Sequence, residues 1–236
     1  PLTLDQQRVY NDLLAESRRT IGDLVKAKGF DRARFEILAI LMRLRQTCCH
    51  LDLLKDRHKP GTYEAPSAKF DAFFELLDEA MDGGHRILLF SQFVALLKLL
   101  RAELDARGLP YCYLDGSTQD RLEQCQRFNL THSIPVFLIS LKAGGTGLNL
   151  TGADMVVHFD PWWNPAVEDQ ATDRAHRIGQ KRTVYSIKLI AEHTIEERVL
   201  DMQQRKQAVI NATVGTTDEG IMRNLSFDDI RDLVGL

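Results

Sequence analysis

Short apolar runs alternate with longer segments of helical periodicity through the middle of the chain. The runs are rich in apolar and β-branched residues, as buried strands are, and they cover 87–90, 111–114, 136–140, 155–159 and 184–189. Between some of them lie segments that are expected to be helical, at 94–106, 122–128 and 165–178. This alternation predicts an α/β fold, with a parallel sheet that helices cover on both faces.

The regions on either side of this alternation are predicted to be helical. Residues 3–50 open with Thr3 and Gln6 at capping-box spacing, and a break between two helices is expected around Gly22, Gly29 and Asp31. Apolar residues then recur at helical steps, at Phe35, Leu38, Leu41 and Leu44.

Polar and capping residues set the expected boundaries. Residues 56–66 are polar and contain two prolines, as linkers do, and a helix is predicted at 67–81. Thr194 and Glu197 have capping-box spacing and predict a helix to about 209, followed by a loop at 215–220 and a last helix at 226–233. The chain is therefore expected to divide into a helical extension with a linker at 1–66, an α/β lobe at 67–192 and C-terminal helices at 193–236.

Composition adds little to this picture. The chain has 236 residues, of which 44% are hydrophobic and 27% charged, as in ordinary globular proteins, and no apolar run approaches the ~20 residues of a membrane span. The four cysteines form no C-x-x-C pair, so buried free thiols are expected rather than a metal site. A net charge of −3 means that any nucleic-acid contact must come from a local patch. Since the chain begins at Pro1 rather than Met, we expect a fragment of a longer protein.

The run DQATDRAHRIGQ, residues 169–180, carries the strongest candidate chemistry. Asn164 is a favoured N-cap and Pro165 suits the first helical position, so a helix is predicted from there to Ile178. Gln170, Arg174 and Arg177 then share one helical face. A guanidinium group can bind two phosphate oxygens at once through two parallel N–H groups. For an isolated R-x-x-R pair, a solvated face of an ordinary amphipathic helix is the commoner explanation.

A glycine-rich loop, KAGGTG at 142–147, follows the strand that ends at Ser140. Ligands usually bind at this carboxyl edge of an open α/β sheet, and glycines let backbone N–H groups approach phosphates closely. The loop lacks the Lys-Ser or Lys-Thr ending of a P-loop, and a tight structural turn explains it equally well. Asn149, just beyond it, is predicted to contact a phosphate or to brace the loop.

Two other features call for interpretation. Trp162 and Trp163 follow a strand end, and neighbours in extended backbone point to opposite sides, so one is expected in the core and the other toward a groove.

The sequence Asp78-Glu79-Ala80-Met81 is similar to a D-E-A-H box, but apolar residues around it have helical spacing. These acids are therefore predicted to lie on the surface of a helix and to bind no Mg²⁺.

Four separate segments resemble one family. The 169–180 run resembles motif VI of the Swi/Snf-type DNA translocases, members of helicase superfamily two. ILLFSQF at 87–93 is similar to that family's motif IV, LDGST at 114–118 to the segment after it, and the stretch at 139–165 to motif V with its continuation. LRQTCCH at 44–50 resembles the segment that leads into the second lobe. The resemblance implies a RecA-like helicase C-terminal lobe, with a protrusion at 1–66 and brace-like helices at 193–236.

The resemblance also implies roles for particular residues. Arg174 and Arg177 would act on the γ-phosphate of ATP across a cleft, while Gln170, Gly145 and Gly147 would also lie on the ATP side. The DNA-facing set would comprise Ser91, Gln92, Gly116, Ser117, Lys142, Asn149 and Trp163. ATP and Mg²⁺ would be held mainly by a missing N-terminal lobe, so this chain is expected to bind neither stably and to hydrolyse no ATP alone.

The implied partners are double-stranded DNA, that N-terminal lobe and a DNA-bound protein. The protein would be intracellular, in the cytoplasm and nucleoid of a bacterium or in a eukaryotic nucleus. Two alternatives stay open at this stage. One is a lobe of a strand-separating superfamily-two helicase, against which the R-A-H-R-I-G-Q ending and the W-N-P segment argue. The other is a non-catalytic docking module, which would need no pair of arginines facing a cleft.

Overall fold

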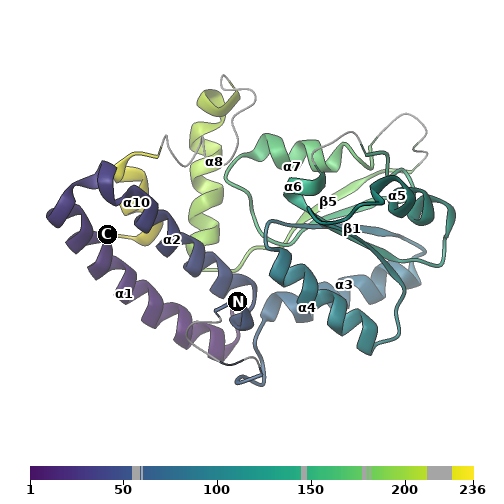
Figure 1. The fold of residues 1–236 in the computed structure, drawn as a ribbon, viewed down its shortest axis with the longest axis horizontal. Coiled ribbons are helices and arrows are strands. Elements are labelled where there is room, and N and C mark those ends of the chain that lie inside the picture. Colours follow the sequence, from purple (N-terminus) through teal and green to yellow (C-terminus); the bar gives the residue numbers. More distant parts are fainter. Residues whose placement is uncertain (55–58, 60, 145–147, 177–179, 181, 212–224) are drawn as a thin grey trace. The chain divides into compact units, whose positions relative to one another are not determined.

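A parallel sheet organises the middle of the chain in the computed structural model (Figure 1). The structure describes residues 1–54, 59, 61–144, 148–176, 180, 182–211 and 225–236. Within these residues the sheet has five strands in the order β2-β3-β1-β4-β5, and every neighbouring pair is parallel. The strands are β1 Ile87–Ser91, β2 Tyr111–Leu114, β3 Val136–Ser140, β4 Met155–His158 and β5 Tyr185–Lys188. The predicted α/β class and all five predicted strands are confirmed.

Helices cover both faces of this sheet. They are α3 Ala68–Asp82, α4 Val94–Ala106, α5 Arg121–Leu130, α6 Leu141–Gly144 and α7 Pro165–Thr172. Helices α3 and α4 lie on one side, while α5, α6 and α7 lie on the other (Figure 1). Strands β1, β3 and β4 are buried along their whole length. On the side of α5, Leu88 and Phe90 pack in one cluster with Phe128 and Phe137, and burying each such side chain stabilises the fold by ~1.5–3 kcal/mol.

The chain divides into two compact units. The sheet and its helices form one unit, Phe70–Leu189, while Pro1–Lys69 and Ile190–Leu236 together form the other. The first and last of the three expected segments therefore join in a single unit, which comprises α1 Leu4–Lys28, α2 Phe30–Cys49, the short 3₁₀ helix η1 Leu51–Leu53, α8 Ile195–Asn211 and α10 Phe227–Val234.

Local signals explain the ends of the first helices. The side chain of Thr3 accepts a hydrogen bond from the Gln6 backbone at 3.1 Å, which confirms the capping box. The break comes at Gly29, whose φ of 79° suits glycine, whereas Gly22 lies inside α1. The helical spacing of Phe35, Leu38, Leu41 and Leu44 is confirmed by α2, although Phe35 is 74% exposed and the buried face is formed by Ile37, Leu41 and Leu44.

Long-range contacts hold the helical unit together. The Tyr10 hydroxyl accepts a hydrogen bond from the Ile195 backbone at 2.6 Å, at the start of α8. Lys69 and Glu196 form a buried ion pair at 2.6 Å, and Glu196 also accepts from the Ala191 backbone at 2.9 Å. The last helix, α10, begins with a capping box at Ser226 near its predicted start, while the predicted loop at 215–220 lies outside the described residues. No described helix combines the length and apolar character that crossing a membrane requires.

Candidate functional site

The candidate residues gather at the carboxyl edge of the sheet. In parallel pairing the register places Ser91 beside Ser140 and Phe90 beside His158, so the segments that follow these strands begin at one edge. The segment after β1 carries Gln92, the segment after β3 carries Lys142, and the segment after β4 carries Asp160. The register therefore brings the segments that carry these candidate residues to one edge, and the individual residues differ in how far they reach the surface.

Asp160, two residues after the end of β4, organises the loop that follows β1. Its carboxylate accepts hydrogen bonds from the Ser91 hydroxyl at 2.5 Å and from the Gln92 side-chain amide at 2.6 Å. Ser91 also accepts from the Phe93 backbone at 3.0 Å, and it is fully buried. The expectation that Ser91 lies on a DNA-facing surface is therefore wrong for this structure, because its hydroxyl is used inside the lobe. Sequence analysis missed Asp160, although an acid soon after a buried strand is a usable signal.

A second buried acid shapes the LDGST loop after β2. Asp115 accepts hydrogen bonds from the Ser117 backbone at 2.8 Å, from its hydroxyl at 2.6 Å and from the Tyr113 hydroxyl at 2.8 Å. Burial alone would raise the pKa of Asp115, but these hydrogen bonds outweigh it and lower the pKa to about 2. The acid therefore stays ionised and holds the loop, which leaves Gly116 and Ser117 exposed as the predicted surface requires.

The segment after β3 begins with α6. Lys142 lies on it and is exposed, as is Asn149 further along, whose carbonyl accepts a hydrogen bond from the Asn129 side chain at 2.9 Å. Gly145 and Gly147 lie outside the described residues. Of the predicted loop residues, Lys142 and Asn149 thus have the surface access that a phosphate contact needs.

Helix α7 begins as predicted and ends early. The Asn164 side chain accepts from the Ala166 backbone at 3.0 Å, and Pro165 is the first helical residue. The helix ends at Thr172 instead of Ile178. The Arg174 backbone N–H bonds Ala171, three residues back rather than four, and its carbonyl accepts from Leu150 at 3.0 Å. The hydrogen bond from Leu150 thus occupies the Arg174 carbonyl, which would accept a backbone N–H if the helix continued for another turn.

The prediction that Gln170, Arg174 and Arg177 share one helical face is therefore wrong, because the helix ends before Arg174. Gln170 lies exposed on α7, Arg174 follows the helix in a turn and is 5% exposed, and Arg177 lies outside the described residues. The bond between Leu150 and Arg174 nevertheless joins two of the predicted segments directly, since Leu150 follows the glycine-rich loop.

Both tryptophans are buried. Trp162 packs in the cluster on the α5 side of the sheet, and its backbone donates to Glu168 of α7 at 2.6 Å. Trp163 is 0% exposed. The expected opposition of core and groove is therefore wrong here, because the segment bends at Trp163 and does not continue as extended strand. Trp163 offers no surface to a DNA groove in this structure.

The acids of the D-E-A-M segment lie exposed on α3, as predicted. The four cysteines are free and buried. Within the described ranges, no group of three or more His, Cys, Asp or Glu side chains is arranged to hold a metal ion. The loops at the carboxyl edge offer a lysine ammonium and backbone N–H groups, which suit phosphate groups, while Arg174 lies beyond the end of α7 beside the turn that contains Leu150.

Comparisons of sequence relate the chain to helicases. A family model described as the helicase conserved C-terminal domain matches residues 68–179. An uncharacterized ATP-dependent helicase of Mycoplasma pneumoniae is 42% identical over 186 residues, covering 78% of this chain and 18% of the relative. The human SWI/SNF-related matrix-associated actin-dependent regulator of chromatin subfamily A member 1 is 40% identical over 195 residues, again covering 78% of this chain and 18% of the relative.

Solved structures decide the family. The C-terminal domain of the SWI2/SNF2 ATPase of Sulfolobus solfataricus matches with a TM-score of 0.73 and 29% identity, covering 98% of this chain and 93% of that one. The chain belongs to the Swi/Snf family. The ATPase core of the same organism in complex with double-stranded DNA matches with a TM-score of 0.78 and 31% identity, covering 100% of this chain and 48% of that one.

The Swi/Snf chain thus corresponds to the C-terminal, RecA-like lobe of the family's ATPase core. It spans about a fifth of the length of the two curated relatives described above. Relatives in this family carry names of ATP-dependent helicases and chromatin-remodelling ATPases, which associates the whole proteins with ATP use.

Proposed function

We propose that this Swi/Snf chain is the C-terminal motor lobe of an ATP-dependent translocase of double-stranded DNA. The observation that carries the proposal is the hydrogen bond from the Leu150 backbone to the Arg174 carbonyl at 3.0 Å. It fixes the segment that follows exposed Lys142 to the segment that carries Arg174. A displacement on the DNA side that moves Leu150 would therefore also move the backbone of Arg174 on the ATP side.

On the ATP side, this chain supplies positive charge rather than a complete nucleotide site. ATP and Mg²⁺ would be held mainly by the N-terminal lobe of the same protein, while Arg174 and Arg177 would meet the γ-phosphate and Gln170 would help to position it. Gly145 and Gly147 would line the same side. A guanidinium fork fits phosphate oxygens well. Because Arg174 is nearly buried, it would turn outward when the lobes close. The chain alone would therefore hydrolyse no ATP.

On the DNA side, exposed and half-buried groups would contact phosphates. Lys142 supplies a charge, while Gln92, Gly116, Ser117 and Asn149 supply donors from neighbouring loops. The double-stranded DNA bound to the Sulfolobus core supports this choice of ligand. Ser91 and Trp163 would support the loops from inside instead of touching DNA. The full protein would act on a DNA-bound protein wherever the cell keeps its DNA, the nucleoid in a bacterium or the nucleus in a eukaryote.

Replacing the two arginines tests this proposal. In the full-length protein, Arg174→Ala and Arg177→Ala should each lower kcat for DNA-stimulated ATP hydrolysis strongly and change KM for ATP much less. An inserted arginine is worth ~10³–10⁵ in kcat in other phosphoryl-transfer enzymes. Lysine at either position should restore little, because an ammonium lacks the planar fork.

Arg127→Ala is the matched control, since Arg127 is an exposed arginine of α5. It should leave turnover unchanged. Near-normal turnover in both Arg174→Ala and Arg177→Ala would show that these arginines serve the fold alone, and the non-catalytic docking module would then be the better explanation.

A further inference from the structure

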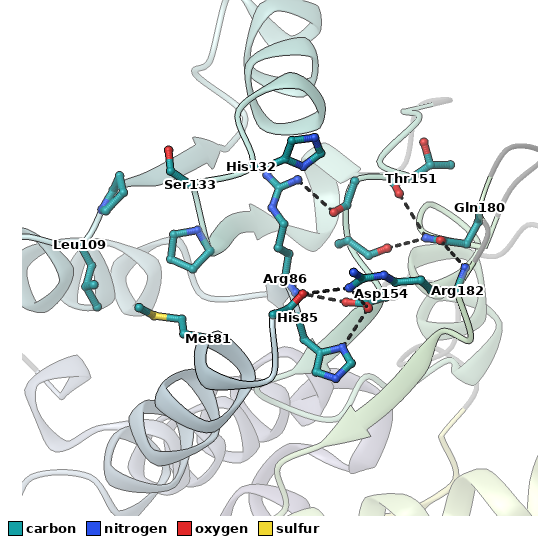
Figure 2. A pocket seen from close by; sticks show the side chains of 15 residues that line it. Met81, His85, Arg86, Leu109, His132, Ser133, Thr151, Asp154, Gln180 and Arg182 are labelled. Atoms are coloured by element: carbon teal, nitrogen blue, oxygen red, sulfur yellow. Dashed lines mark hydrogen bonds and ion pairs between the residues drawn. The ribbon is translucent and has the colours of Figure 1, made fainter.

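The turn at 149–154 is enclosed by hydrogen bonds from side chains. It connects the glycine-rich segment to the start of β4, and a cavity of ≈ 640 Å³ opens beside it at the amino edge of the sheet. Figure 2 shows Arg86 and Gln180 reaching the turn from either side, with Asp154 and Arg182 below. The turn also contains Leu150, whose backbone holds Arg174.

Arg86 and Asn129 secure the turn from one side. The Arg86 guanidinium donates to the carbonyls of Gly152 at 3.0 Å and Ile134 at 2.9 Å, and it also bonds Phe128 and Thr131 at the end of α5. Asn129 donates to the Asn149 carbonyl at 2.9 Å and accepts from the Gly152 backbone at 3.0 Å. This side of the turn is therefore fixed to α5.

Gln180 secures the turn from the other side. Its amide nitrogen donates to the carbonyls of Ala153 at 2.7 Å and Thr151 at 3.2 Å, and it lies 3.4 Å from the Ala175 carbonyl. Its amide oxygen accepts from the Arg182 backbone at 2.9 Å. One side chain therefore joins the turn, the residue next to Arg174 and the chain that enters β5.

We propose that Gln180 is a positioning residue, which sets the place of Arg174 relative to the turn. The proposal rests on the proposed function, since it gives Arg174 a role in hydrolysis. Arg174 is held to the turn twice, through its own carbonyl bound by Leu150 and through the neighbouring Ala175 carbonyl near Gln180. Without the amide donors, only the bond between Leu150 and Arg174 would remain, and the arginine could then shift along the turn.

The chemistry of the contacts requires an amide at this position. The two N–H groups of the amide nitrogen point among three carbonyl oxygens, which need a donor, while the Arg182 backbone N–H needs an acceptor. Glutamate has the same shape, but at neutral pH it accepts hydrogen bonds without donating any. Gln180→Glu thus separates donation from packing, and Gln180→Ala removes both.

Kinetics of the full-length protein test this role. Gln180→Ala and Gln180→Glu should each lower kcat for DNA-stimulated ATP hydrolysis by ~10–100-fold with KM for ATP changed less than about threefold, because a misplacement of ~1 Å can cost ~10²-fold in rate. Gln126→Ala, at an exposed glutamine of α5, should have no effect. Normal kcat in Gln180→Glu, or a loss confined to KM, would overturn the proposal.

A double-mutant cycle separates this inference from the proposed function. If Gln180 acts through Arg174, adding Gln180→Ala to Arg174→Ala should cause no further loss of single-turnover rate. A further loss equal to that of Gln180→Ala alone would overturn the positioning role while leaving the arginine assignment intact, and it is also the result that simple destabilisation would give. If Arg174→Ala alone has normal turnover, the arginine assignment fails, and a slow Gln180→Ala variant would then show that Gln180 positions some other group.

Discussion

Asp115 and Asp160 show how single buried carboxylates shape the candidate site. Each is tied to the end of a strand and accepts hydrogen bonds from hydroxyl, amide or backbone groups of a loop. Hydrogen bonds to a charged acceptor are stronger than neutral ones, and they fix the donor's direction. The exposed loop residues, among them Ser117, can therefore contact a ligand from a fixed backbone. Both carboxylates are buried, so their role in holding the loops is recognised only from their hydrogen-bond partners.

At the same scale, Trp163 is predicted to stabilise the core. The side chain is fully buried, so Trp163→Ala should lower the free energy of unfolding by ~3–5 kcal/mol, as large-to-small aromatic changes do in cores. Thermal and denaturant melts of the chain measure this loss, and Leu122→Ala, at an exposed leucine of α5, is the control. An unchanged melt combined with defective translocation of the full protein would instead return Trp163 to the DNA interface.

At the scale of elements, strands were predictable and one helix end was not. Strands β1, β3 and β4 are buried on both faces, so their sequences are continuous apolar runs with clear boundaries. The capping signals of α1, α7 and α10 are equally local. The end of α7 depends instead on a tertiary bond between Leu150 and Arg174, which no local pattern of residues 165–178 contains.

Strand β4 ends with a titratable residue that should make stability depend on pH. The His158 ring stacks on Phe90, and its Nε2 lies 3.3 Å from the Thr172 hydroxyl. Burial, with a smaller effect from Lys188, lowers the pKa of His158 to about 4 from 6.5. In the unfolded chain His158 is protonated as the pH falls through 6.5, whereas in the folded chain it is protonated only at about pH 4. Stability is full above pH 6.5 and is lost as the pH falls to about 4.

Comparison with His158→Gln measures this effect. Between pH 7 and pH 4 the wild-type chain should lose ~3 kcal/mol more unfolding free energy than the variant, since each pKa unit corresponds to ~1.4 kcal/mol. Denaturant melts at pH 7, 6, 5 and 4 provide the values, and other titrating groups cancel in the difference. Parallel curves for the two proteins would mean that His158 accepts its proton in the folded chain as easily as in the unfolded one.

At the scale of the whole molecule, the outer segments were predictable as helices but not as one unit. Tyr10 bonds Ile195 and Arg18 bonds the Val234 carbonyl at 2.7 Å, across most of the length of the chain. Helical periodicity reports which face of each helix is apolar, and it does not report which distant helix covers that face. The sequence therefore supported three segments in a row, whereas the contacts join 1–69 with 190–236.

The net charge of −3 means that the proposed DNA contact must come from a local patch of the molecule. With no overall attraction to a polyanion, affinity would come from the few cations on the loops at the carboxyl edge, among which Lys142 is exposed. Each phosphate contact displaces about one counterion, and its loss reduces the slope of log affinity against log salt by ~1. Lys142→Ala in the full-length protein should therefore flatten this slope by roughly one unit for any duplex sequence.

Lys98 supplies the matched control, because it is an exposed lysine on α4, which lies on the opposite face of the sheet from α6. Lys98→Ala and Lys142→Ala change the net charge equally, so a general electrostatic effect would shift both titrations alike. A slope altered only by Lys142→Ala places a phosphate at α6. Equal slopes for the two variants would mean that the duplex is bound elsewhere, and the hydrogen bond between Leu150 and Arg174 would then have no DNA contact at Lys142 to respond to.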